Sequence, residues 1–406
     1  MKSNFRFWFS ILVIWTLATC LDRLWWNQYT GIPSWDQADY LNSALDHARA
    51  FELVEGGKWK GFKSLLDLSP KIPPLGSIVN GIIIAIKGDE PSDAAWSLSV
   101  WHGILLIGVA GWSRSLHSQR LGVIATGLVA VAPVLVNLRT SFVLEMPLVA
   151  GVTWAVWQLG NWNDPFKGGK WKQVFIASAL STSAILIKQS ALLVLLPAII
   201  WTGFLAISNN SKRKWQFLAG LSIGLCGIIP WLKHNWITTL GGTNRAVFES
   251  AAIEGDPSIF SLENWTWYPS LIPQQISAII LGVGISGLLI WIFKRSKMSQ
   301  QFSNANLATD NIFGWKWLLI NLFFGWLITS LIPNKDHRYI TPLIVPLLIC
   351  LGRGWLELTL FIESNLSRRS IKSLLFTLIG GLFAAVPIHQ INIMSKTIEL
   401  ESTIAS

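Results

Sequence analysis

The sequence contains 406 residues, of which 51% are hydrophobic and only 13% are charged, whereas about 25% of the residues in an ordinary soluble protein are charged. So few charges do not cover a soluble surface, and apolar stretches of membrane-spanning length recur along the chain. The composition excludes a soluble enzyme, a nucleic-acid-binding protein and a disordered scaffold. It predicts an all-α, polytopic integral membrane protein.

Apolar windows predict about eleven transmembrane helices. A twelfth apolar run, residues 75–86, has only 12 residues, fewer than the roughly 17 that a spanning helix needs. We expect one transmembrane domain over residues 1–406, with spans at 5–21, 94–112, 120–138, 141–160, 173–187, 190–207, 215–231, 276–293, 317–333, 340–356 and 373–390.

The distribution of Lys and Arg orients these spans, because cytoplasmic loops are enriched in both residues. If residues 75–86 do not cross the membrane, the strongly basic connectors fall on the same side as Lys2 and Arg6. We therefore expect a re-entrant or interfacial helix at 75–86 and a cytoplasmic N-terminus in a plasma (inner) membrane. The net charge of +10 then orients the helices and gives no evidence for a nucleic-acid partner. The connectors are residues 114–120, 167–172, 212–214, 294–297 and 368–372.

Two long segments, residues 22–93 and 232–275, face outward in this topology. Most other connectors are much shorter, and long connectors usually hold functional residues. We expect the active site on the outer face, with catalytic residues in segment 22–93 and substrate-binding residues in segment 232–275.

Asp36, Asp39 and Tyr40 lie at the start of a helix that we expect to run through Phe51. Asp36 and Tyr40 are i, i+4 neighbours, and the two aspartates are i, i+3 neighbours. Two carboxylates would thus be held together at the outer surface, with either one as the working group. The alternative is that they only favour the helix start, since acidic residues are common in a first turn.

Three further charged residues lie near the outer ends of predicted spans. Lys71 precedes a Pro-Pro pair and would lie at headgroup height, either reaching generally toward lipid phosphate or binding one phosphate. Glu145 lies about one turn inside an apolar run, where a charge is costly and usually functional; the alternative is an ion pair with Arg139 that joins two helices. Lys188 is a phosphate ligand or an ordinary interfacial lysine.

The turn at residues 333–342 is the last charged cluster. Arg338 offers a planar fork that suits phosphate, which Lys335 would bind only as a point charge. His337 alone is typical of a structural hydrogen bond, and no spacing in the chain forms a metal motif. Carboxylates and basic residues are expected at the same membrane face, which suits a reaction that needs a base and a stabilised phosphate. The basic residues are Lys71, Arg139, Lys188 and Arg338.

The glycines of two predicted spans have the spacing of close helix contacts and do not resemble a phosphate loop. No internal repeat is visible, which argues against an inverted-repeat transporter. The glycines are Gly220, Gly224 and Gly227 in one span and Gly284 and Gly287 in another.

The order of these motifs resembles the superfamily C glycosyltransferases, in particular the protein O-mannosyltransferase-like (family 39-type) and aminoarabinose lipid A transferase-like group. Members carry Asp-Glu-x-x-Tyr in the first outer loop, where this chain reads Asp36-Gln37-Ala38-Asp39-Tyr40. The resemblance implies that Asp36 is the catalytic base. Because Gln37 replaces the glutamate, a second carboxylate has a role only if Asp39 substitutes for it.

Other motifs match the same group. Lys71 matches the lysine before the group's Pro-Pro pair, and Glu145 matches the acidic residue before its Met-Pro-Leu. Arg338-Tyr339 matches its late Arg-Tyr pair. Pro230-Trp231 and Asn235 resemble the entry to its second long loop. The chain ends soon after its last predicted span, so we expect no large soluble C-terminal domain. Residues expected to bind substrate are Asp39, Tyr40, Lys71, Arg139, Glu145, Lys188, Arg338 and Tyr339.

The resemblance implies a hexosyl or pentosyl transferase that uses a polyprenyl-phosphate-linked donor and a glycan, lipid or protein acceptor. Asp36 would accept the acceptor proton, the anomeric carbon would invert, and Arg338, Lys71 and Lys188 would stabilise the departing phosphate. A divalent metal held by Asp36, Asp39 or Glu145 is compatible with this chemistry, but the sequence does not require one. Expected partners are membrane lipids, the donor and the acceptor.

Two other classes of protein fit the composition. A transporter or flippase of lipid-linked sugars would use the same basic groups, with broken helices and charges near the middle of the membrane. A non-catalytic membrane scaffold would tolerate substitution of Asp36, Glu145 and Arg338 together.

Overall fold

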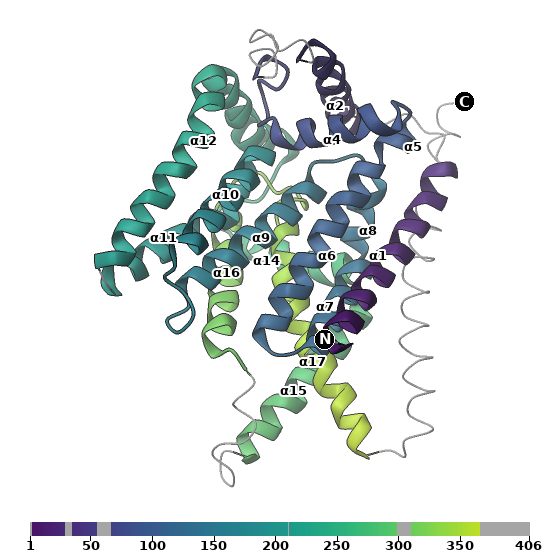
Figure 1. Ribbon diagram of the computed structural model, residues 1–406, viewed down its shortest axis with the longest axis vertical. Helices are drawn as coiled ribbons and strands as arrows, with labels where there is room; N and C mark the ends of the chain where they lie inside the picture. Colours follow the sequence, from purple (N-terminus) through teal and green to yellow (C-terminus); the bar gives the residue numbers. More distant parts are fainter. Residues whose placement is uncertain (1, 29–34, 55–65, 210, 299–309, 366–406) are drawn as a thin grey trace.

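The computed structural model describes residues 2–28, 35–54, 66–209, 211–298 and 310–365. Within these ranges every regular element is a helix, as the composition predicts (Figure 1). The first part of the chain forms α1 (Lys2–Gln28), α2 (Trp35–Val54), α4 (Leu75–Lys87), α5 (Pro91–Ala94), α6 (Trp96–Leu116), α7 (Gln119–Val131), α8 (Pro133–Thr140) and α9 (Glu145–Asn163).

The second part is also helical and contains the longest element, α12. It forms α10 (Trp171–Ile187), a 3₁₀ turn η1 (Gln189–Ala191), α11 (Leu192–Asn209), α12 (Ser211–Asn244), a π-helical turn η2 (Arg245–Glu249), α13 (Ser250–Glu254), α14 (Leu262–Ile276), α15 (Ala278–Met298), α16 (Ile312–Ser330) and α17 (Thr341–Asn365).

Local chemistry explains several helix boundaries. The Ser118 side chain accepts the N–H of Leu121 at 3.3 Å before α7, and Asn311 accepts the N–H of Gly314 at 2.9 Å before α16. Such side-chain acceptors satisfy donors that have no partner in a first turn. Pro133 separates α7 from α8, because its ring has no N–H to continue the ladder.

Six helices of the described residues are long and apolar enough to cross a membrane, and two bent pairs raise the number to eight. The pairs are α7 with α8, bent by 59°, and α14 with α15, bent by 103°. The spans expected at 141–160 and 173–187 correspond to α9 and α10, which are not among these helices, and the span expected at 373–390 lies outside the described residues. The count of eleven stays a prediction.

The short helix α4 lies with α2 at the end of the bundle opposite the N-terminus (Figure 1). The two helices approach closely, because a Cβ on Gly81 would lie 2.8 Å from the Ala44 carbonyl oxygen. Ser43 also donates a hydrogen bond to Ser77 at 3.1 Å. Segment 75–86 is therefore packed against the helix that begins with the Asp36 motif.

The glycines singled out in the sequence lie at helix contacts, which confirms their interpretation. Cβ atoms on Gly284 and Gly287 of α15 would lie 2.8 Å from Leu351 and 1.9 Å from the carbonyl oxygen of Gly354 in α17. Gly220, Gly224 and Gly227 of α12 face Ser178 and Thr182 of α10 in the same way.

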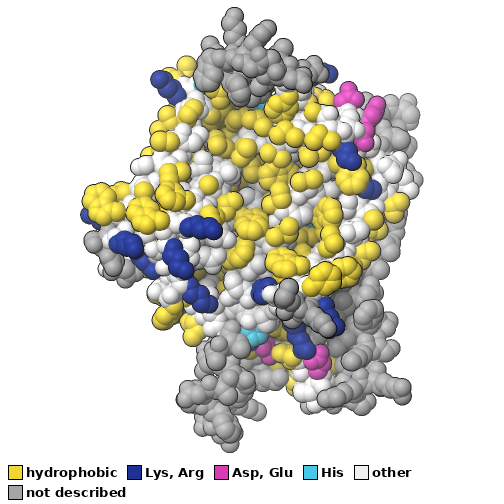
Figure 2. Space-filling model, viewed as in Figure 1, with side chains coloured by type: hydrophobic (Ala, Val, Ile, Leu, Met, Phe, Trp, Pro, Cys, Tyr) yellow, Lys and Arg dark blue, Asp and Glu magenta, His cyan; other side chains and the backbone are white. Residues whose placement is uncertain are grey.

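Hydrophobic side chains cover the middle of the face seen in Figure 2, and most Lys and Arg side chains on that face lie below this band. Large apolar side chains are exposed along several helices, among them Ile207, Leu240 and Phe293. A band of this kind is expected where a protein meets lipid.

Candidate active site

The guanidinium of Arg338, in the turn between α16 and α17, lies among three carboxylates. Its Nη1 lies 2.5 Å from Asp36 Oδ2, at the start of α2, and its Nη2 lies 2.6 Å from Asp336 Oδ2. Its Nε lies 4.0 Å from Glu145 Oε1, in the first turn of α9. One side chain thus joins segments that are far apart in the sequence.

Asp336 orients this arginine. It accepts Nε of Arg338 at 2.8 and 3.1 Å and the backbone N–H of the same residue at 2.8 Å. Burial lowers the pKa of Arg338, but the hydrogen bonds to Asp336 and the charge of Glu145 raise it above its ordinary value. Burial raises the pKa of Asp336, and the hydrogen bonds and charge of Arg338 outweigh that effect and lower it. The pair is therefore charged at neutral pH.

Glu145 and Lys188 form the buried side of this charged cluster. Their side chains are only 2% and 13% exposed, and Lys188 Nζ donates a hydrogen bond to Glu145 Oε1. The Lys188 amino group also lies 5.5 Å from the centre of the Tyr40 ring. Within the described residues the second oxygen of Glu145, Oε2, is buried without a hydrogen-bond partner. Glu145 therefore keeps one unsatisfied acceptor.

A cavity of about 530 Å³ opens beside the cluster. Asp36 and Arg338 line it, with side chains 48% and 27% exposed. Glu254 adds a residue from the second long outer segment. The other lining residues are Trp35, Gln37, Val134, Asn137, Leu138, Ser141, Val143, Asn334, Lys335, Asp336 and His337. A mixed, charged cavity of this kind suits a ligand with both phosphate and hydroxyl groups.

Comparison with known proteins agrees with this arrangement. Residues 71–234 match the family described as dolichyl-phosphate-mannose-protein mannosyltransferase. The apo crystal structure of ArnT from Cupriavidus metallidurans superimposes with a TM-score of 0.61 at 14% identity, covering 92% of this chain and 62% of that one. The chain therefore shares its fold with ArnT. That fold confirms the expected resemblance and the multi-pass membrane architecture.

Two further structures also resemble this chain in fold. ArnT from Cupriavidus metallidurans bound to undecaprenyl phosphate gives a TM-score of 0.58 at 14% identity, covering 99% of this chain and 73% of that one. The oligosaccharyltransferase AglB from Archaeoglobus fulgidus, in complex with an inhibitory peptide and a dolichol-phosphate, gives 0.52 at 9% identity, covering 95% and 56%. No curated protein sequence matches the chain.

Arg139 does not join the Arg338 cluster, so the alternative in which it pairs with Glu145 is not the arrangement of this structure. Its Nε lies 2.7 Å from Asp22 Oδ2 at the end of α1, and both side chains are 3% exposed. Its Nη1 also donates to the Ala130 carbonyl at 2.9 Å. The sequence could not reveal this partner, because nothing in it relates the end of α1 to α8. Arg139 joins helices and has almost no surface for a substrate.

Lys71 and Asp39 form a separate, exposed pair. Lys71 Nζ lies 4.0 Å from Asp39 Oδ2, and the two side chains are 63% and 67% exposed. Gln189, next to Lys188, donates to the Lys71 carbonyl at 3.4 Å. Lys71 is thereby held next to the cluster without contacting Arg338.

Residues of α12 hold the segment that leads to Lys71. Trp231 Nε1 donates to the Ser69 carbonyl at 2.9 Å, and Asn235 donates to the Leu66 carbonyl at 3.1 Å. These are the residues that resemble the family's entry to the second long loop. In this chain they position the first loop.

Sequence reasoning missed Asp336, Gln37 and the position of Lys335. The spacing of Asp336, two residues before Arg338 in one charged turn, was the available signal. Gln37 Oε1 accepts the N–H of Phe142 at 3.2 Å and so joins α2 to the loop before α9. Lys335 is 4% exposed and donates to the Ser330 carbonyl at 2.9 Å, so it caps α16.

Each of the carboxylates that could hold a metal is paired with a cation. Asp36 pairs with Arg338, Asp39 with Lys71 and Glu145 with Lys188. Across the described ranges no group of three or more His, Cys, Asp or Glu side chains is arranged to hold an ion. In this arrangement the three carboxylates are neutralised by Arg338, Lys71 and Lys188.

Proposed function

We propose that this chain is a membrane glycosyltransferase that moves one hexosyl or pentosyl group from a polyprenyl-phosphate-linked donor to a glycan, lipid or protein acceptor. The observation that supports this proposal best is the position of the Arg338 cluster beside a cavity, in a fold shared with ArnT and AglB. Transfer of a sugar from a lipid phosphate requires a cation for the leaving phosphate and a base for the acceptor. The Arg338 guanidinium and the accessible Asp36 carboxylate supply these two groups.

Asp36 acts as the base in this proposal. The acceptor hydroxyl gives its proton to the Asp36 carboxylate while its oxygen forms a bond to the anomeric carbon. The bond from that carbon to the phosphate oxygen breaks, and its electron pair leaves with the polyprenyl phosphate. Attack from the face opposite the leaving group inverts the anomeric carbon. Asp36 can serve because it lines the cavity and is about half exposed.

Proton transfer also changes the partners of Arg338. While the Asp36 carboxylate is charged, it accepts a hydrogen bond from Nη1 of the Arg338 guanidinium. Once Asp36 is protonated, that attraction weakens and Nη1 is free for the oxygen of the departing phosphate. During this exchange Asp336 keeps its hydrogen bond from Nε of Arg338, so the guanidinium stays oriented. The cation would thus reach the leaving group as its negative charge grows, where stabilisation contributes most to the rate.

The remaining predicted residues surround these two groups. Lys188, oriented by Glu145 and packed over Tyr40, adds a second fixed cation. The unsatisfied Oε2 of Glu145 suits a hydroxyl of the sugar. Lys71, held near Asp39 at the exposed end, suits attraction of the incoming phosphate headgroup. Tyr339 follows Arg338 in the same turn and is partly buried against the core.

Substitution of Asp36 tests the proposal. Asp36→Asn should lower transfer of radiolabelled sugar from a polyprenyl-phosphate donor in proteoliposomes by roughly 100-fold to 10,000-fold, because a general base is lost. Asp46→Asn is the matched control, since Asp46 lies on the same helix, is half exposed and pairs only with Arg49 at 3.9 Å among the described residues. Normal transfer by an inserted Asp36→Asn protein would refute the base assignment.

A transporter of lipid-linked sugars is the second candidate, because the bent pairs α7–α8 and α14–α15 are the broken helices that such a protein would use. The Arg338 cluster, however, lies where α2 meets helix ends, not at helix centres. Measuring sugar transfer and lipid translocation in the same proteoliposomes separates the two. Translocation without transfer would favour the transporter, and neither activity would favour a scaffold.

A further inference from the structure

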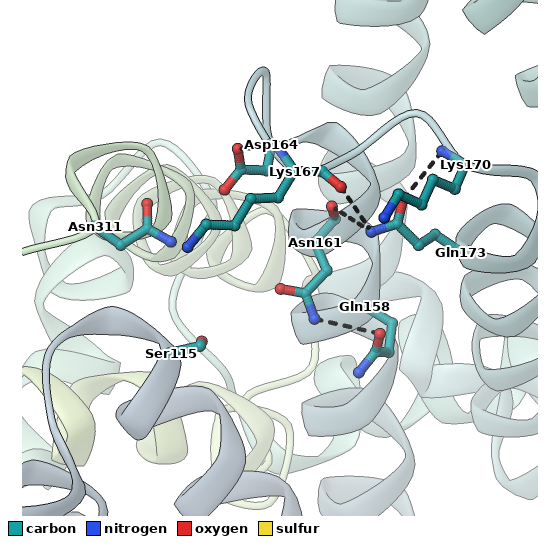
Figure 3. Close-up of a pocket in the computed structure, with 8 residues that line it drawn as sticks. All are labelled: Ser115, Gln158, Asn161, Asp164, Lys167, Lys170, Gln173 and Asn311. Atoms are coloured by element: carbon teal, nitrogen blue, oxygen red, sulfur yellow. Dashed lines mark hydrogen bonds between the residues drawn. The ribbon is translucent and has the colours of Figure 1, made fainter.

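A second cavity, of about 440 Å³, lies on the side of the basic connectors, away from the Arg338 cluster. It forms between the last turns of α6 and α9, the loop that enters α10 and the residue that begins α16 (Figure 3). Every lining residue is polar. They are Ser115, Gln158, Asn161, Asp164, Lys167, Lys170, Gln173 and Asn311.

The loop between α9 and α10, which bears both lysines, has a defined conformation. Asp164 Oδ1 accepts the N–H of Lys167 at 3.0 Å, and Gly169 donates to the Trp162 carbonyl at 3.0 Å. Gly169 has a φ of +77°, and a Cβ on Gly168 would lie 2.1 Å from the Trp162 carbonyl oxygen. Only glycine fits both positions, so the loop is built around its backbone hydrogen bonds.

Side chains of α12 fix this loop from outside the cavity. Arg213 donates to the carbonyls of Asn163 and Asp164 at 3.1 and 3.2 Å. Gln216 donates to the Gly169 carbonyl at 2.8 Å. Arg213 and Gln216 of one helix therefore hold the loop, and the backbone that carries Lys167 and Lys170 has a fixed position.

The opposite wall is fixed by a separate network. Asn311 donates its N–H to the Leu116 carbonyl at 2.9 Å. The preceding residue, Asp310, lies 2.8 Å from His117 Nδ1 and 3.7 Å from Arg353 Nη2. Burial raises the pKa of Asp310, and His117 and Arg353 outweigh that effect and lower it. Both walls of the cavity, the α9–α10 loop and the segment at Asn311, are thereby held by hydrogen bonds and ion pairs.

Cationic side chains at this cavity outnumber anionic ones, with two lysines and one aspartate. Among the described residues neither Lys167 nor Lys170 forms an ion pair, and Asp164 is already engaged by backbone N–H groups. Asn311 Oδ1 accepts the N–H of Gly314, so its amide nitrogen is the end that remains for the cavity. Figure 3 shows Lys167 extending toward Asn311. Lysines on two sides of the cavity, neither of them in an ion pair within the described structure, favour an anion.

We propose that this cavity binds a phosphate ester. The phosphate would lie between Lys167, Lys170 and the amide nitrogen of Asn311, where charge-assisted hydrogen bonds are strong. The side-chain amides of Gln158 and Asn161, which share one hydrogen bond of 3.3 Å, would meet hydroxyl groups of the ester. The ester comes either from an anionic phospholipid of the basic-side leaflet or from a soluble metabolite. This site is independent of the proposed transfer reaction.

The test compares two double variants of the full-length protein in detergent. Lys167→Gln with Lys170→Gln removes both cavity lysines, and Lys172→Gln with Lys214→Gln removes two exposed lysines from the same side that do not line the cavity. Native mass spectrometry measures binding of phosphatidylglycerol against phosphatidylcholine. Binding of glycerol 1-phosphate is measured by thermal shift and by competition with the lipid.

The wild type and the control variant should bind a phosphate ester selectively. The affinity of the cavity variant should be about 10-fold to 30-fold lower, because each lysine that is removed lowers the affinity roughly fivefold. Selective phosphatidylglycerol binding without glycerol 1-phosphate binding identifies a lipid, and the reverse identifies a soluble ester. Equal losses in the two double variants, or no selective binding of either probe to the wild type, would overturn the proposal.

Asn311→Asp provides a second variant that should fold well. Aspartate remains a good helix cap for α16, but it places a second carboxylate in the cavity, opposite Lys167. We expect thermal stability to be unchanged or higher while phosphate-ester binding falls at least tenfold. Binding that persists in this variant at the wild-type affinity would contradict the position proposed for the phosphate.

Discussion

Arg338 and Lys188 bring two positive charges to a cluster in which Asp36, Asp336 and Glu145 bring three negative ones. The free cluster is therefore negative by one charge, which opposes a phosphate. Uptake of a proton by Asp36 removes that excess. The same step that activates the acceptor thus prepares the cluster for the leaving group, and catalysis and phosphate affinity depend on one carboxylate.

This coupling predicts opposite effects of one substitution on binding and turnover. Asp36→Asn removes a negative charge and the strong hold on Arg338, so polyprenyl phosphate should bind about tenfold more tightly while sugar transfer is lost. Equilibrium binding of the lipid phosphate to purified protein measures the first effect. Weaker binding in Asp36→Asn than in the wild type would show that Asp36 contacts the ligand directly.

Arg338 itself should be needed for the reaction rate. Arg338→Ala should lower transfer roughly 100-fold to 1,000-fold, in line with the loss of one preorganised donor at a developing charge. Arg245→Ala is the control, because Arg245 is 80% exposed and pairs with Glu249 at 3.8 Å. Single-turnover rates with enzyme in excess over donor measure the effect. A rate close to that of the control would assign Arg338 a structural role only.

The lowered pKa of Asp336 predicts how stability depends on pH. The folded state holds the Asp336 carboxylate charged below its ordinary pKa near 3.8. Its contribution is therefore complete above that value and is lost as the pH falls through the lowered pKa. Thermal unfolding should show Asp336→Asn less stable than the wild type at pH 6, with the difference shrinking below pH 4. A constant difference down to pH 3 would contradict the pairing.

At the scale of residues, the sequence predicts which charges lie at one membrane face but not which atoms meet. The cluster formed by Asp36, Glu145, Lys188 and Arg338 arises because each of these residues lies at or next to a helix end. Arg139 satisfies the same rule and is nevertheless buried elsewhere. Ion pairs between helix ends depend on helix packing, which periodicity does not reveal.

At the scale of elements, α15 and α17 meet where glycines allow their backbones to touch. A Cβ on Gly354 would lie 1.9 Å from the Gly284 carbonyl oxygen, whereas a Cβ on Gly282 meets nothing within 4 Å in the described structure. Gly354→Ala should therefore lower stability by about 1–3 kcal/mol, while Gly282→Ala should have little effect. Thermal unfolding of both variants in detergent makes the comparison, and equal stabilities would contradict the close contact.

Helix positions were predictable where apolar runs are long, as for α1, α6, α11 and α16. The bends were not. Pro133 is visible in the sequence, but the 59° turn between α7 and α8 depends on tertiary packing. The 103° turn between α14 and α15 occurs at Ser277, which has a φ of +78° and carries no sequence signal for a turn.

At the scale of the whole molecule, composition alone predicts a helical membrane protein, and the charge distribution predicts its sidedness. Phe166 lies in the basic loop before α10, and Phe260 lies in the second outer segment; each is 91% exposed. With Cys20, Cys226 and Cys350 replaced by Ala, Phe260→Cys should react with a membrane-impermeant thiol reagent in intact cells. Phe166→Cys should react only after permeabilisation. The opposite pattern would invert the proposed topology.

The Asp22–Arg139 pair has a consequence for the order of assembly. Its residues are 117 positions apart, so Asp22 leaves the ribosome well before its partner. Until α8 emerges, the Asp22 carboxylate near the end of α1 lacks the Arg139 partner, and the Ala130 carbonyl at the α7–α8 break lacks its donor. Arrival of Arg139 satisfies both at once. One arginine thereby neutralises the carboxylate of α1 and satisfies the carbonyl at the α7–α8 break.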